Sequence, residues 1–236
     1  MNRTRQNVMG VLLRRYVILL YFLTICINCL FLYYDLPYVA VTSSLPVPLL
    51  LLYLFLKDPH INSPAGKFIF YIGLLFAFFG DVLQIVVTNE LFFTCSLVAF
   101  MLMNICYSIS FYNLNRGGLK KPLAFLAAIV VLAVMGYAFV SILETEIGTY
   151  KVPLILYMST LITMTAFVIH AAGSEHYYQI AVKYLLPGTI IFIIQNIIFA
   201  LNLFHSGGPS NGFIYSIIPY AIAQFLMVRG MEKAYL

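Results

Sequence analysis

Eight apolar runs, each long enough to cross a lipid bilayer, make up most of this chain of 236 residues. A helix needs about 20 mostly apolar residues to cross the roughly 30 Å of hydrocarbon in a membrane. The runs cover about residues 16–34, 37–56, 68–88, 91–112, 123–143, 152–172, 184–204 and 213–229. Because the connections between them are short, we expect one transmembrane domain over residues 1–236 and no separate soluble domain.

The composition agrees with this interpretation, since 63% of the residues are hydrophobic and only 9% are charged. A soluble domain is about 25% charged. The predicted fold class is therefore an all-α membrane protein, a bundle of eight transmembrane helices. The second run contains Pro46 and Pro48, so this helix should be kinked or locally unwound in its middle.

The distribution of Lys and Arg predicts the orientation, because cytoplasmic loops carry an excess of these residues. With a cytoplasmic N-terminus, 12 of the 13 basic residues fall on the cytoplasmic side and only Lys151 falls outside. An even number of helices then places both termini in the cytoplasm. The formal net charge of +5 is explained by basic residues beside anionic headgroups, and it predicts no nucleic-acid partner. The expected location is the plasma membrane, the inner membrane of a bacterium.

Asp81 is the most informative single residue, because it follows a long apolar stretch in FIFYIGLLFAFFGDVLQIVV, residues 68–87. A carboxylate at membrane depth costs roughly 2.5 to 3.5 kcal/mol on insertion scales. Such a group should be neutral, paired or directed into a watery cavity. We therefore expect Asp81 to point into the bundle and to mark a functional site.

Several polar side chains on other predicted helices lie at a depth from which they could share a site with Asp81. Asp81 and Asn196 both stand about 20 Å from the cytoplasmic ends of their helices, at about 1.5 Å per residue. The candidate neighbours are Gln84, Asn104, Tyr107, Gln195, Asn196, Tyr220 and Gln224. Polar residues within spans also serve as hydrogen-bonding glue between helices, and this alternative stays open for each of them.

A weak internal repeat links the two halves of the chain. Gly73 precedes Asp81 by eight residues and Gly188 precedes Asn196 by eight, and the two polar positions are 115 residues apart. Four helices followed by four in the same orientation would form a parallel repeat, a class that tends to place its site at mid-membrane between the halves. Chance is the alternative explanation.

The order of these residues resembles the YhhN family of membrane proteins, which includes the lysoplasmalogenases. The resemblance runs from about residue 38 to 230 and rests on spaced motifs rather than on one strong signature. These motifs contain Gly80 and Asp81, then Phe100, Asn104, Tyr107 and Phe111, then Tyr157 and Met164, then Gly188, Phe192, Gln195 and Asn196, and finally Tyr220, Ala223, Gln224 and Leu226.

The resemblance implies hydrolysis of the vinyl ether bond of a lysoplasmalogen, giving a fatty aldehyde and a glycerophospholipid headgroup. Such a bond is cleaved by protonating carbon, so the reaction needs a carboxylic acid that stays protonated near neutral pH. Burial away from water disfavours the charged form of a carboxyl group. Asp81 matches the family's first acid and is the candidate catalytic residue. Tyr157 joins the seven polar neighbours named above as a candidate substrate-binding residue, and we expect neither a metal nor another cofactor.

This chain departs from the family pattern at three positions. It has Gln195 and Asn196 where the family typically has Ser-Asp, Asn104 where it has His, and Ser43-Ser44 where it has Lys-Pro. An amide can neither act as a base nor carry the charge that would stabilise an oxocarbenium ion. Two hypotheses follow. One is a lysoplasmalogenase-like hydrolase of full, reduced or lost activity, and the other is a non-catalytic membrane protein that binds or moves a lysolipid or another amphiphile. In both cases the expected partner is a membrane lipid or lysophospholipid, and no obligate protein partner is predicted.

Overall fold

The computed structural model describes residues 2–36, 38–57, 65–86, 88–115, 122–205 and 213–235, and this part of the chain consists of helices joined by short turns, with no strand. Residue 37, where the second predicted run begins, lies outside the described residues. Seven helical stretches of the described chain are long and apolar enough to cross a membrane. The all-helical, multipass membrane architecture predicted from the sequence is therefore confirmed.

The membrane-crossing elements follow the predicted runs closely. They are α1 (Asn2–Tyr33), α4 (Ala65–Gln84), α5 (Glu90–Tyr112), α6 (Pro122–Ile142), α8 (Lys151–Ala171), α10 (Leu186–Ala200) and α11 (Ile214–Tyr235). Shorter pieces connect or extend them, namely α7 (Glu144–Ile147), η1 (Gly148–Tyr150), α9 (Tyr178–Ile180) and the two π-helical segments η2 (Ala181–Leu185) and η3 (Leu201–His205).

The second predicted run forms two helices instead of one. Helix α2 (Val39–Ser44) ends before Leu45, and α3 (Pro46–Lys57) begins after it. Proline has no backbone N–H to donate, and its ring collides with the carbonyl group four residues earlier in a continuous helix. Pro46 and Pro48 together therefore interrupt the hydrogen bonding of the run where the sequence predicts, although Leu45 between the two pieces keeps a helical backbone with φ −72° and ψ −32°.

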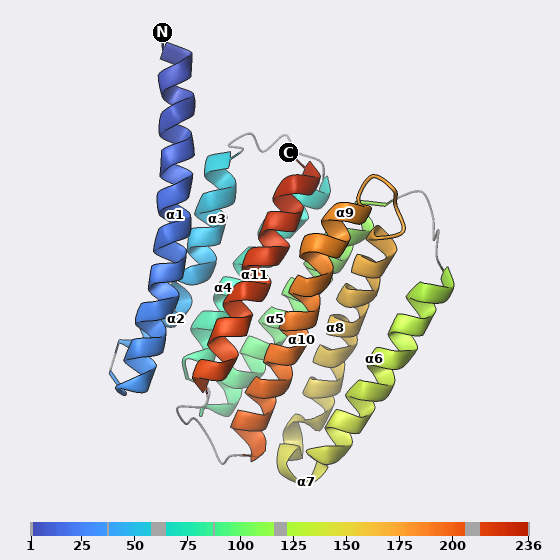
Figure 1. The fold of residues 1–236 in the computed structure, drawn as a ribbon. Coiled ribbons are helices and arrows are strands. Elements are labelled where there is room, and N and C mark those ends of the chain that lie inside the picture. The colour runs from blue at the N-terminus through green and yellow to red at the C-terminus, as the bar shows by residue number, and fades with distance from the viewer. Residues whose placement is uncertain are drawn as a thin grey trace.

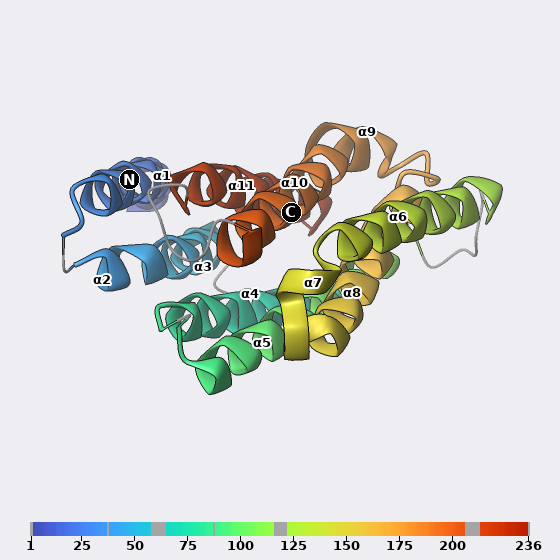
Figure 2. The same cartoon turned by 90° about the horizontal axis from the view of Figure 1, so that it is seen from below.

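The helices form two layers that face each other (Figures 1 and 2). One layer contains α1, α11 and α10, and the other contains α4, α5 and α8. Helix α3 packs against α1, α4 and α11, whereas α6 lies at the opposite edge and packs mainly against α8. Both ends of the described chain lie at the same end of the bundle, called here the termini end (Figure 1). The opposite end carries α7 and is called the α7 end.

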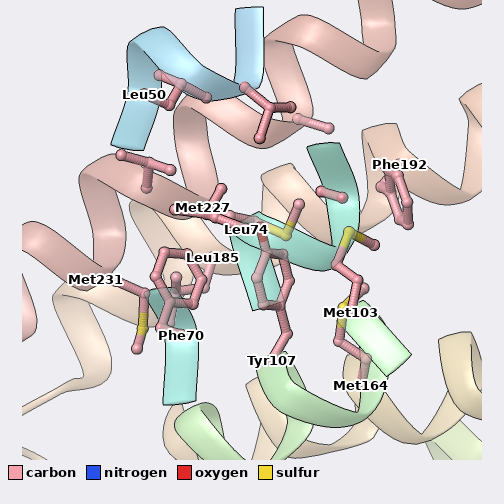
Figure 3. Packing of buried hydrophobic residues seen from close by; sticks show 14 of the residues in the cluster. Leu50, Phe70, Leu74, Met103, Tyr107, Met164, Leu185, Phe192, Met227 and Met231 are labelled. Carbon is pink, nitrogen blue, oxygen red and sulfur yellow. The ribbon is translucent and has the colours of Figure 1, made fainter. Parts of the chain in front are cut away.

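A glycine allows the two most closely packed helices, α4 and α5, to approach each other. A Cβ atom at Gly73 would lie 2.7 Å from ring carbons of Tyr107, so no larger residue fits at that position without a shift. The Tyr107 ring is fully buried and stacks on Phe70, with 4.5 Å between the ring centroids (Figure 3). Around this contact, apolar side chains from both layers form the core of the bundle.

A charged cluster joins α3 to α11 at the termini end. The Glu232 carboxylate is 5% exposed and accepts hydrogen bonds from Tyr53 (2.8 Å), Lys57 (2.9 Å) and Arg229 (2.6 Å). The Arg229 guanidinium also donates to the Tyr53 hydroxyl and lies over the Tyr53 ring. One carboxylate thus satisfies two cations and a hydroxyl group from two helices.

We expect Glu232→Gln to destabilise the bundle, because the neutral amide leaves Lys57 and Arg229 without their counter-charge. Hydrogen bonds to charged groups contribute about 1.5 to 3 kcal/mol each, so the folded state should lose about 1 to 3 kcal/mol. The loss should appear as a lower midpoint in thermal unfolding of the purified protein in detergent. Glu175→Gln, at an exposed acid near the same end, is the matched control, and equal midpoints for the two variants would contradict the prediction.

Candidate functional site

A cavity of about 480 Å³ lies at the α7 end of the bundle, between the two layers. Its walls come from the last turns of α1 and α4, from α2 and the start of α3, and from parts of α5, α6, α8, α10 and α11. The lining is mostly apolar, and the volume lies in the range of about 300 to 1,000 Å³ that is typical of small-molecule sites. Six of the nine predicted site residues line it, namely Asp81, Gln84, Tyr157, Gln195, Asn196 and Tyr220.

Asp81 stands one turn before the end of α4, and its residue is 8% exposed. The carboxyl group interacts with the Tyr220 hydroxyl of α11. Neither Oδ2 of Asp81 nor the Tyr220 hydroxyl oxygen makes a hydrogen bond that meets normal geometry within the described part of the chain. Two buried polar atoms with unmet hydrogen-bonding capacity therefore face each other at the cavity wall.

The residue before Asp81 determines where Tyr220 lies. A Cβ atom at Gly80 would lie 2.8 Å from ring carbons of Phe100, so only glycine leaves room for that ring. The Phe100 ring in turn meets the Tyr220 ring edge to face, with 6.4 Å between the centroids. The Gly80-Asp81 pair thus brings α5 close to α4, and the Phe100 ring supports Tyr220 beside the carboxyl group.

Three tyrosine hydroxyls surround Asp81, but two of them are already used. Tyr21, Tyr107 and Tyr220 all interact electrostatically with the carboxyl group. The Tyr21 hydroxyl donates to the Ala221 carbonyl at 2.6 Å, and the Tyr107 hydroxyl donates to Oε1 of Gln224 at 2.9 Å. The Tyr220 hydroxyl is consequently the one of the three that can donate to Asp81 or to a ligand beside it.

Asn196, which stands where the family pattern has a second acid, is bonded to the protein at both its oxygen and its nitrogen. Its Oδ1 accepts a hydrogen bond from the Tyr157 hydroxyl at 2.6 Å, and its Nδ2 donates to the Phe192 carbonyl at 2.7 Å. Gln84 and Gln195 differ from it, since neither carboxamide makes a side-chain hydrogen bond within the described residues and both line the cavity. These two amides, rather than Asn196, are available to hold water or a ligand.

The remaining three predicted residues lie behind the cavity wall. Tyr107 and Gln224 bond to each other across α5 and α11, and Nε2 of Gln224 also contacts the Met103 sulfur at 3.4 Å. Asn104 donates to Thr160 at 3.2 Å, and its Oδ1 has no partner among the described residues. Behind the wall, the side chains of Tyr107, Gln224 and Asn104 therefore link neighbouring helices and support the residues that line the cavity.

Sequence reasoning did not assign three polar residues that line the cavity, Asn28 of α1, Ser43 of α2 and Ser216 of α11. Oδ1 of Asn28 accepts a hydrogen bond from Thr42 at 2.9 Å, and Oγ of Ser43 lies 3.4 Å from it. A signal was present, because Asn28 is an amide within an apolar span and lies at a depth similar to that of Asp81. Ser43 entered the sequence argument only as a departure from the family pattern.

The arrangement offers proton chemistry. Asp81 is the one charged residue among the described residues that line the cavity. Groups of three or more His, Cys, Asp or Glu side chains that could hold a metal ion do not occur in the described chain. One carboxyl group, one adjacent phenol and two amides in an apolar chamber can donate and accept a proton and orient a water molecule.

Comparison with known proteins adds one match. A sequence model described as the YhhN family matches residues 39–231, which is most of the chain. No curated protein and no solved structure matches the chain.

We expect Tyr157→Phe to destabilise the protein, because Oδ1 of the partly buried Asn196 would lose its hydrogen-bond donor. Leaving a buried acceptor unsatisfied costs about 1 to 3 kcal/mol. Tyr137→Phe is the matched control, because Tyr137 of α6 is 77% exposed. Thermal unfolding in detergent should give a clearly lower midpoint for Tyr157→Phe alone. A midpoint unchanged from the wild type would show that the Tyr157–Asn196 bond does not hold α8 against α10.

Proposed function

Because the chain belongs to the YhhN family, we propose that it hydrolyses the vinyl ether bond of a single-chain ether lipid, which is the lysoplasmalogenase reaction. The observation that carries the proposal is the position of Asp81, an 8% exposed acid with an unsatisfied oxygen at the wall of a mostly apolar cavity. Cleavage of a vinyl ether begins with proton transfer to carbon. A carboxyl group away from water, with no cation among the described lining residues to hold it ionised, is suited to donate that proton.

One acid is enough to balance the reaction. Protonated Asp81 gives its proton to the terminal carbon of the C=C–O unit, and the substrate becomes an oxocarbenium ion beside the new carboxylate. A water molecule then adds to the cationic carbon, while the same carboxylate takes a proton from that water. The resulting hemiacetal breaks its carbon–oxygen bond, the ether oxygen leaves with a proton as an alcohol, and a fatty aldehyde remains. Asp81 ends as it began, in the acid form.

Neighbouring groups support this cycle. The Tyr220 hydroxyl faces Asp81 and can donate to the carboxylate once the proton has left, which stabilises the ion pair that forms with the substrate. The carboxamides of Gln84 and Gln195 line the same cavity and can orient the attacking water. In the family pattern a second carboxylate can act as the base. In this chain Asp81 takes that role itself, because after donating its proton it accepts one from the attacking water.

The proposal includes an orientation in the membrane. With the termini end in the cytoplasm, the basic residues Lys57, Lys67, Lys183, Arg229 and Lys233 lie on the cytoplasmic side, as the positive-inside rule requires. The cavity at the α7 end would then lie in the outer half of the bilayer. The membrane we propose is the plasma membrane, the inner membrane in a bacterium.

The parallel four-plus-four repeat is also part of the proposal, and the helix pairings support it. Helix α1 packs with α3 as α6 packs with α8, α4 packs with α5 as α10 packs with α11, and α3 meets α4 as α8 meets α10. The two matched glycines also play the same structural role, because each allows a neighbouring helix to approach closely. Gly73 leaves room for Tyr107 of α5, and Gly188 leaves room for Ala223 and Met227 of α11. The cavity lies between the halves, with Asp81 from one and Asn196 from the other.

Asp81→Asn tests the catalytic assignment. The purified protein in mixed micelles should release fatty aldehyde from a lysoplasmalogen, and the variant should be at least about a hundredfold slower, because general acid catalysis contributes about 10² to 10⁴. The wild-type rate should also fall in D₂O, since proton transfer to carbon is the difficult step. Asp35→Asn makes the same chemical change at an exposed acid where φ is 52°, a conformation that Asn tolerates. This control should keep the wild-type rate, and equal rates for the wild type and Asp81→Asn would refute the mechanism.

A second candidate is a non-catalytic protein that binds or moves a lysolipid or another amphiphile, and the engagement of both ends of the Asn196 amide favours it. With these two bonds made, the Asn196 amide has less capacity left to hold a water molecule than the unbonded amides of Gln84 and Gln195. This candidate predicts saturable binding of a saturated ether lipid without aldehyde release from its vinyl ether counterpart. Binding with no turnover would select it over the hydrolase.

A further inference from the structure

The cavity has two ends of different chemical character. The residues of α6 that line it are apolar, and beyond them the polar groups of Tyr157 and Asn196 are bonded to each other, whereas α1 and α2 contribute the polar side chains Asn28 and Ser43 among apolar ones. Because α6 and α1 lie at opposite edges of the bundle (Figure 2), the chamber extends across the molecule from an apolar end to a polar end. Such a shape matches a single-chain lipid, with its tail toward α6 and its polar group toward α1 and α2.

The polar end provides hydrogen-bonding groups but no positive charge. Asp81 is the one charged side chain among the described lining residues, and it is an acid. The groups beside it are amides and hydroxyls, and the Ser43 hydroxyl already donates to the Val39 carbonyl. No Lys or Arg among the described lining residues is placed to receive an anion.

The surface at the α7 end of the bundle, beside the cavity, is acidic as well. Four exposed acids lie at the α7 end, Asp35, Glu90, Glu144 and Glu146. The basic side chains described near them are already paired, because Lys151 bonds to Glu144 and the His205 ring lies 2.9 Å from Glu146. The sequence of residues 206–212, which follows η3, contains no Lys or Arg. This distribution of charge disfavours the approach of an anion.

A phosphate group would have to enter this environment if the substrate carried one. In a lysoplasmalogen the phosphate is attached to the same glycerol as the vinyl ether, only a few bonds away. When the ether reaches Asp81, the phosphate is therefore drawn into the polar end of the cavity. Burying an unpaired charge costs several kcal/mol, whereas the hydroxyl groups of a bare glycerol can bond to the free amides of Gln84 and Gln195.

We propose that the preferred ligand is a single-chain glycerol ether without a phosphate group, a 1-O-alkenylglycerol in place of a lysoplasmalogen. This inference rests on the proposed function, because it assumes that a single-chain ether lipid occupies the cavity. It departs from the substrate that the family resemblance implies, and the cause is the absence of a cation at the polar end.

Competition for covalent labelling measures this preference without relying on catalysis. The probe is 1-O-hexadecylglycerol with a photoreactive diazirine near the end of its saturated tail, applied to the wild-type protein in phosphatidylcholine nanodiscs. We expect labelled peptides from α6, α8 and α10. Unlabelled 1-O-hexadecylglycerol should suppress this labelling at a concentration at least about tenfold lower than that required for 1-O-hexadecylglycero-3-phosphate or its phosphocholine ester, and tenfold corresponds to 1.4 kcal/mol.

A substitution that adds a cation tests the cause. Ser43→Lys places an ammonium group at the polar end, and Ser43→Met, of similar length and without charge, is the matched control. Relative to Ser43→Met, Ser43→Lys should narrow the tenfold gap by improving competition by the two phosphate lipids. The affinity for hexadecylglycerol should be the same in both variants.

The possible failures separate this inference from the proposed function. Equal or better competition by the phosphate lipids on the wild-type protein would overturn the inference and leave the hydrolase proposal in place. No labelling of the cavity peptides by the probe would also overturn the inference, whereas the hydrolase proposal is judged separately by aldehyde release from a lysoplasmalogen and its loss in Asp81→Asn. An unchanged gap in Ser43→Lys relative to Ser43→Met would show that the missing cation does not set the preference.

Discussion

A carboxyl group held among helices in a membrane has to be satisfied by the protein or by what the protein binds, and this constraint explains the surroundings of Asp81. The protein meets it in part, with one phenol close to the carboxyl and two more within electrostatic range. Two of those phenols are committed elsewhere, to the Ala221 carbonyl and to Gln224. The remaining capacity lies at the cavity wall, and this distinguishes Asp81 from an acid whose bonds are all made within the protein.

The same cost of burial explains how charge is divided between the two ends of the molecule. At the termini end, Glu232 is nearly as buried as Asp81, yet it has two cations and a phenol around it. A carboxylate satisfied in this way is held ionised and joins α3 to α11 as a fixed element. At the α7 end the acid has no such partner within the described residues, and burial disfavours a charged carboxyl group. The two buried acids Glu232 and Asp81 therefore differ in their surroundings, because Glu232 is bonded to two cations and a phenol and Asp81 lies at the cavity wall without a cation among the described residues.

Much of the architecture could be predicted, because length and hydrophobicity are local properties of the chain. The break at Leu45 also followed from local chemistry, since prolines interrupt a helix wherever they fall. Depth along a helix was predictable in the same way, and it placed Asp81 and Asn196 together, whereas Tyr157 was named only through the family resemblance. The direction of a side chain around its helix was not, because it depends on which helices become neighbours. Asn104, Tyr107 and Gln224 have suitable depths, yet they lie behind the cavity wall, between helices.

Asn28 and Asn196 show what else sequence reasoning could not reach. Both are amides within apolar spans, so the pattern alone treats them alike. In the structure, Asn196 is tied at both ends by protein groups, whereas Asn28 uses its oxygen for α2 and lines the polar end of the cavity. Their tasks differ because hydrogen-bonding capacity is consumed by neighbours that lie far away in sequence. An amide in place of an acid at position 196 also keeps the chamber free of a second negative charge, so in the proposed mechanism proton transfer from Asp81 would create a single ion pair in the cavity.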